Sequence, residues 1–212
     1  MYKCIFSAHC IENVCDMSCP IFAESSYLLE RNDIDIKNGV FQLGEEYFDA
    51  ATRILDRFKD KVGTVIATSS DFDTVKVAEL LTYCGICRHW KGSNLHTTVY
   101  NLKYSQYLDE LKKSWTSKDS TTVDYMKIWS ENAKVLVISS FDYVNFKEFE
   151  AQTLLMLLQS RGYKQLTTIL VSPPVMHLLS NNGTFFNLLT SRYLKSDNVV
   201  RFENIKGGGS VK

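Results

Sequence analysis

Four cysteines within the first nineteen residues are the densest group of candidate metal ligands in the chain. They are Cys4, Cys10, Cys15 and Cys19, and His9, a further candidate ligand, lies among them. A segment this short has too little apolar surface to fold alone, so a tetrahedral metal ion would supply the missing stability. Zinc is the ion we expect, and a closing Cys-Pro pair leaves an iron–sulfur cluster as the alternative. Residues 1–31 are thus predicted to form a Cys-rich metal-binding segment.

A polar turn follows the apolar run at residues 63–67 and precedes a helical pattern. Strand, loop and helix in this order are the setting of a phosphate-binding loop. The turn holds Thr68, Ser69, Asp71 and Asp73 and leads into Thr74, but it contains no glycine. Without glycine the backbone N–H groups cannot approach phosphates closely, and two carboxylates would repel them. These residues therefore predict a degenerate nucleotide site, and we expect no ATP to bind there.

Hydroxyl side chains follow two further apolar runs. Ser139 and Ser140 come directly after residues 135–138, and Ser172 comes directly after residues 168–171. A helical pattern at 146–161 joins the two runs into a β–α–β unit, which almost always lies in a parallel sheet. Functional groups in such sheets lie just past the carboxyl ends of the strands. The functional groups of any site at these strand ends are therefore predicted to be hydroxyls and not carboxylates.

The spacing of apolar residues predicts the helices and strands that position these side chains. We expect helices at 20–31, 45–61, 74–83, 104–115, 121–129, 146–161, 175–179 and 184–194, and strands at 63–67, 96–100, 135–138, 168–171 and 198–202. Cys84 and Cys87 are expected at a helix end, packed against the sheet. The predicted organisation is a Cys-rich segment at 1–31, a linker at 32–44, an α/β domain at 45–206 and a flexible tail at 207–212.

The composition excludes some classes of function. The chain has 24 basic and 24 acidic residues, whereas proteins that mainly bind phosphate backbones carry a basic surplus. No apolar run reaches the ~20 residues that a membrane span requires. The first residues also lack the apolar stretch of a signal peptide, so we expect a cytoplasmic protein with no membrane partner.

The order of elements resembles the ATPase domain of the bacterial and phage replicative helicase loaders, the DnaC/DnaI group of AAA+ proteins. The resemblance covers roughly residues 45–206, and its most specific parts are 133–140, 159–163 and 167–173. In the family these hold an apolar strand ending in two aspartates, a helix with an arginine-aromatic pair, and a strand ending in Thr-Ser-Asn. The resemblance implies an α/β fold of the AAA+ (P-loop NTPase-like) class, with a parallel sheet flanked by helices and a small Cys-rich appendage.

The departures from the family pattern imply a protein without ATPase activity. Ser139 and Ser140 replace the acidic pair, Thr74 stands about where the lysine belongs, and Pro173 replaces the polar sensor. Phosphoryl transfer depends on such positioned charges. The stretch at 187–192, which ends in Arg192, resembles the family's Ser-Arg segment. The resemblance implies that Arg192 could act as an arginine finger that reaches the nucleotide site of a neighbouring subunit. The partners implied are a replicative helicase or an active AAA+ loader in a hetero-oligomer, with single-stranded DNA as a further candidate.

Two other functions stay open at this point. One is a zinc or iron–sulfur protein associated with nucleic acid, in which the Cys-rich segment carries the activity. The other is a hydrolase that reuses the parallel sheet, with Asp71, Asp73, Ser139 and Ser140 at strand ends. No histidine lies at a strand end to activate a nucleophile, and His177, near Pro174, is the candidate base.

Overall fold

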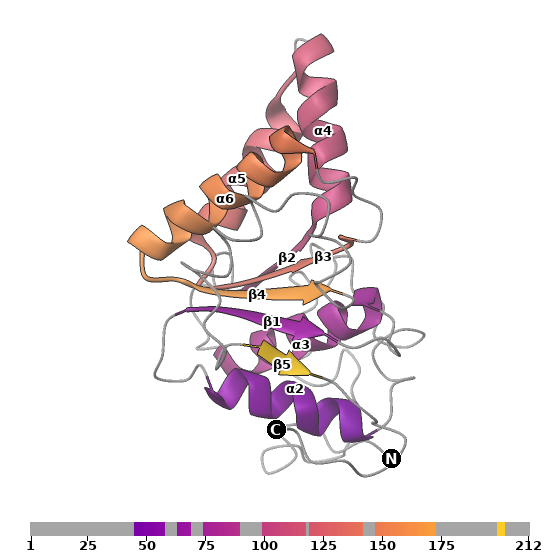
Figure 1. Cartoon of the computed structure of the whole chain (residues 1–212), viewed down its shortest axis with the longest axis vertical. Helices are drawn as coiled ribbons and strands as arrows, with labels where there is room; N and C mark the ends of the chain where they lie inside the picture. The colour runs from indigo at the N-terminus through magenta and orange to yellow at the C-terminus, as the bar shows by residue number, and fades with distance from the viewer. Residues whose placement is uncertain are drawn as a thin grey trace, which may run out of the picture.

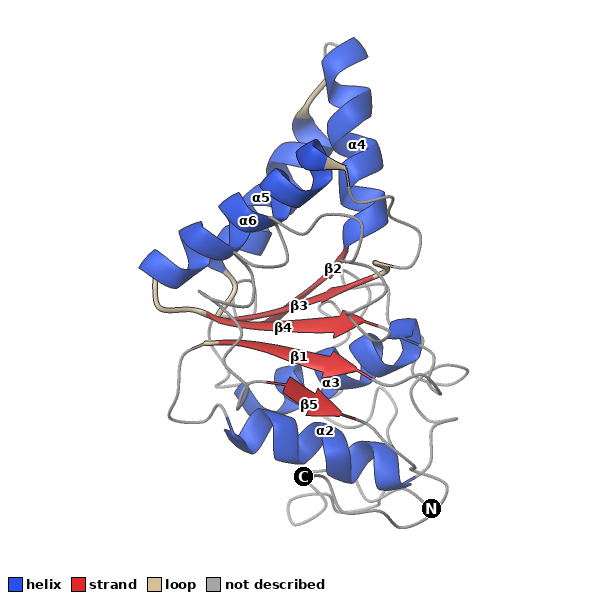
Figure 2. Cartoon of the chain, viewed as in Figure 1, coloured by secondary structure: helices blue, strands red, loops and turns tan. Residues whose placement is uncertain are grey.

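The computed structural model describes residues 45–57, 63–68, 74–89, 99–117, 119–141, 147–172 and 199–201. Along the chain these residues form α2 (Glu45–Arg57), β1 (Thr64–Thr68), α3 (Thr74–His89), β2 (Val99–Lys103), α4 (Tyr104–Thr116), α5 (Thr121–Asn132), β3 (Val135–Ser139), α6 (Glu148–Tyr163), β4 (Thr167–Ser172) and β5 (Val199–Arg201). Each of β1, β2 and β3 is followed by one or two helices before the next strand, as expected for an α/β fold (Figure 2).

The described strands form one sheet in the order β2-β3-β4-β1-β5, and every neighbouring pair is parallel. The predicted β–α–β unit is confirmed, because β3 and β4 pair directly with Leu136 opposite Thr168. β3 is buried along its whole length, which explains why its sequence is continuously apolar and does not alternate. Strand β5, within the strand predicted at 198–202, pairs with β1 at the end of the described strand order.

Two helical layers cover the sheet, with α2 and α3 on one face and α4, α5 and α6 on the other (Figure 1). Adjacent residues of β2 show the division. Val99 lies against Gly85 of α3, whereas the ring of Tyr100 contacts Trp129 of α5, with centroids 5.6 Å apart. Side chains alternate between the faces of a strand, so these two contacts place the helices on opposite sides.

Helix α3 is buried on nearly every side, because it lies between the sheet and α2. Residues 77–86 are all buried, including Glu79 and Thr82, and the Thr82 hydroxyl donates to the carbonyl of Ala78. A helix with apolar residues all round is expected in such a position, whereas α2 shows the single apolar stripe of a surface helix.

A large hydrophobic core lies between the sheet and the layer of α4, α5 and α6. It joins strand residues Leu102, Leu136, Ile138 and Leu170 to helix residues Tyr104, Leu108, Val123, Met126, Leu154 and Leu158. Burying a leucine or isoleucine contributes about 1.5–3 kcal/mol. This core therefore fixes the three helices on the sheet and holds the ends of β2, β3 and β4 in place.

Three expectations from the sequence are corrected by the structure. Helix α3 continues to His89 and does not end near Tyr83, so Cys84 lies inside the helix as a buried thiol outside any disulfide. Strand β2 (Val99–Lys103) continues to Lys103, three residues beyond the end of the predicted run at 96–100. Trp115, which the apolar spacing of the helix predicted at 104–115 places among its core-facing residues, is 63% exposed.

Other expectations lie outside the described residues. These are the Cys-rich segment at 1–31, the linker at 32–44, the helices at 175–179 and 184–194, and the tail at 207–212. Among the described helices, none combines the length and the apolar character needed to cross a bilayer.

Candidate functional site

The carboxyl ends of the five described strands meet at one edge of the sheet, as they must in a parallel arrangement. The strands end at Lys103, Ser139, Ser172, Thr68 and Arg201. Thr68 lies opposite both Ser172 and Arg201, and Lys103 lies opposite Ser139. The structure thus brings the predicted residues Thr68, Ser139 and Ser172 to the same edge, with Ser140 next to Ser139.

None of these strand-terminal residues is acidic. Two of the five are basic and three carry hydroxyls, so the charge at this edge differs from that of a magnesium site, which uses carboxylate oxygens. Lys103 was not singled out from the sequence. Its place at the end of a strand would have pointed to it, because β2 pairs with β3 and the two strands end opposite one another at Lys103 and Ser139.

Ser139 and Ser140 are both buried, at 0% and 4% exposure. Within the described part of the chain, the Ser139 hydroxyl has no hydrogen-bond partner. Ser140 has a φ of 62°, in the left-handed region that non-glycine residues rarely adopt. The chain therefore leaves β3 through a strained residue, and neither hydroxyl is presented to solvent as the nucleophile of a hydrolase would be.

Thr74, placed by the resemblance near the lysine of the phosphate loop, is the first residue of α3 and is buried. The remaining predicted site residues lie outside the described residues. They are the nucleotide-loop residues Ser69, Asp71 and Asp73, the finger candidate Arg192, the base candidate His177, and the ligand candidates Cys4, His9, Cys10, Cys15 and Cys19. Within the described ranges, no three His, Cys, Asp or Glu side chains lie together as a metal site would require.

Helix α4 is joined to β2 without a loop, since β2 ends at Lys103 and α4 begins at Tyr104. The buried hydroxyl of Tyr104 donates to the backbone carbonyl of Glu150 in α6 at 2.5 Å. Burial raises the pKa of Tyr104, so this hydroxyl stays protonated and remains a donor. Helix α6 is thereby tied to the end of β2, at the carboxyl edge of the sheet.

The side chain of Glu150 completes this connection. Its Oε1 accepts a hydrogen bond from Lys112 of α4 at 2.9 Å, while its Oε2 has no partner among the described residues. Burial opposes ionisation of Glu150, but the bond from Lys112 and the backbone N–H groups of Glu150 and Lys147 outweigh it and lower its pKa. Glu150 is therefore ionised at neutral pH and paired across two helices.

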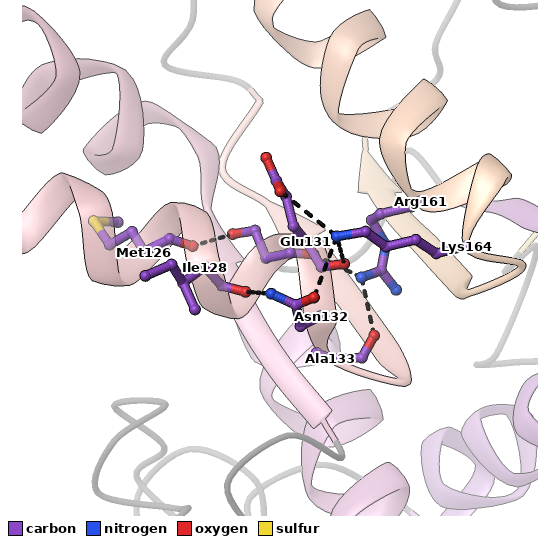
Figure 3. Close-up of polar contacts among 8 residues, drawn as sticks. Met126, Ile128, Glu131, Asn132, Ala133, Arg161 and Lys164 are labelled. Carbon is purple, nitrogen blue, oxygen red and sulfur yellow. Dashed lines mark hydrogen bonds and ion pairs between the residues drawn. The ribbon is translucent and has the colours of Figure 1, made fainter.

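A second group of buried polar contacts lies at the amino ends of the described strands, around Arg161. Arg161 of α6 is completely buried, and its guanidinium donates to three backbone carbonyls and one hydroxyl. Figure 3 shows the bond to the carbonyl of Ala133. The bonds run to Ser130 O at 2.6 Å, Ala133 O at 2.9 Å, Thr168 Oγ1 at 2.8 Å and Thr167 O. Burial lowers the pKa of Arg161 to about 9, which still leaves it protonated at neutral pH.

The position of Arg161 assigns it a structural task. Ala133 precedes β3, and Thr167 and Thr168 begin β4, so the bonds lie at the amino ends of the strands. The candidate site lies at the carboxyl ends, one strand length away. Arg161 therefore holds α5, α6 and β4 together and takes no part in the chemistry of the other edge.

A search for relatives gives no family assignment. No protein-family model matches the chain, and no curated protein matches it. The function is therefore inferred from the fold and from the residues at the strand ends.

Proposed function

We propose that this chain is a degenerate AAA+ protein, similar to the replicative helicase loaders, that acts by binding other proteins and does not hydrolyse ATP. The observation that carries the proposal is the end of β3. Ser139 and Ser140 lie there, at the carboxyl edge and beside Lys103, where the resemblance implies two carboxylates. A hydroxyl pair cannot hold magnesium through water or orient an attacking water as those carboxylates would.

The strand order supports the fold part of the proposal. Strand β4 lies between β1, which leads toward the polar turn, and β3, which ends in the serine pair. In AAA+ domains one strand likewise separates the strand of the phosphate loop from the strand of the acidic pair. A Rossmann-type sheet has a different strand order, 3-2-1-4-5-6, in which the third strand lies beside the second and not beside the fourth.

The preserved scaffold supports the binding part of the proposal. The core between the sheet and α4–α6 is apolar, and the buried guanidinium of Arg161 has four hydrogen-bond acceptors. In contrast, none of the described strands ends in a carboxylate. A chain that keeps its packing without the catalytic charges is suited to work as a scaffold. The partners we propose are the replicative helicase or an active AAA+ loader, contacted in the cytoplasm partly through a metal-bound Cys-rich segment.

Two measurements on the purified full-length chain test this proposal. Mg-ATP titration followed by calorimetry should give no saturable binding, and phosphate release should equal that of buffer, with an active loader as positive control. Saturable Mg-ATP binding with hydrolysis would contradict the proposal.

The binding partner is tested by a pull-down from the source cells with the wild type and with Cys15→Ser. We expect the wild type to retain the helicase or the active loader and the Cys15→Ser variant to lose it. Zinc content and visible absorbance of the two proteins distinguish a zinc site from an iron–sulfur cluster, which is coloured. Retention of neither partner by the wild type would refute the loader-like function.

A further inference from the structure

We draw no further inference here: the strongest candidate, the polar pair at the carboxyl ends of β2 and β3, where the buried Ser139 lies opposite Lys103 and its hydroxyl has no hydrogen-bond partner among the described residues, belongs to the candidate site already described at that edge of the sheet.

Discussion

The Nε of Arg161 donates to the hydroxyl of Thr168, seven residues later in the sequence, at 2.8 Å. Arg161 lies in the last turn of α6 and Thr168 is the second residue of β4, so the bond closes the connection between the helix and the strand that follows it. The same guanidinium reaches the carbonyls at the end of α5, and it thus joins two helices to the start of one strand.

Replacing Arg161 with methionine should destabilise the fold strongly. The substitution keeps much of the apolar side-chain volume but leaves three buried carbonyls and a hydroxyl without their donor. We expect the free energy of unfolding to fall by at least about 3 kcal/mol, measured by urea denaturation. Lys127→Met, an exposed change on α5, is the matched control and should have little effect. A small loss in Arg161→Met would show that water can replace the guanidinium.

The end of α6 offers a stabilising substitution. Gln165 has a φ of 54°, its N–H donates to Gly162 O, and the N–H of Leu166 donates to Arg161 O. This pair of bonds is a Schellman motif, whose left-handed position favours glycine. Gln165→Gly should therefore raise the free energy of unfolding by up to about 1 kcal/mol. Gln165→Ala keeps the strain and should give no gain, so equal effects of the two variants would contradict this explanation.

Gly85 allows a matched pair of substitutions inside α3. A Cβ at this position would lie 3.4 Å from both terminal carbons of Val99, which is ordinary contact. Gly85→Ala should thus stabilise the protein by about 0.5–1 kcal/mol through helix propensity. Gly85→Leu would push α3 away from β2 and should cost about 1–3 kcal/mol. Thermal unfolding of both variants measures the effect, and opposite signs are the expected result.

The buried hydroxyl of Ser139 should contribute nothing to stability. Since it has no partner among the described residues, Ser139→Ala removes only an unsatisfied group and should leave stability unchanged or raise it by up to about 1 kcal/mol. Ser130 is the comparison, because its hydroxyl is also buried but donates to Met126 O at 2.6 Å. Ser130→Ala should cost about 1 kcal/mol. Similar losses in both variants would show that Ser139 is hydrogen-bonded.

Acidification should remove the contribution of the Glu150–Lys112 pair. The pKa of Glu150 is lowered in the folded chain, so its stabilising effect is complete above the ordinary carboxyl pKa of about 4.3 and is lost as the pH falls through the lowered value. Glu150→Gln should be less stable than the wild type at pH 7 and should lose less on acidification. Urea midpoints from neutral to acidic pH measure both slopes, with Glu148→Gln as the control on the same helix. Identical slopes for the wild type and Glu150→Gln would refute the assignment.

The sequence predicted the central part of the fold because its signals there are local. The continuous apolar runs of β3 and β4 and the helix between them are all present, and the parallel pairing follows from that connection. The convergence of Thr68, Ser139 and Ser172 at one edge follows from the same rule. The strand order, however, depends on contacts between distant parts of the chain, and local patterns do not contain it.

The incorrect predictions have identifiable physical causes. The segment around Cys84 and Gly85 was interpreted as a helix end because glycine often ends helices, whereas α3 continues through Gly85, which lies against Val99. The buried position of Arg161 was not predicted, because an arginine in a last turn is usually solvated. The signal was present in its spacing, since Arg161 follows Leu154 and Leu158 on the same buried stripe of α6.

The acceptors around Arg161 have a further consequence for how this chain can change over time. Three of the four belong to the main chain, so replacing the side chains at positions 130, 133 and 167 leaves them in place. The side chains at these three positions can therefore change extensively during evolution while position 161 itself stays arginine. A single invariant guanidinium amid variable neighbours would be the trace by which distant relatives of this chain could be recognised.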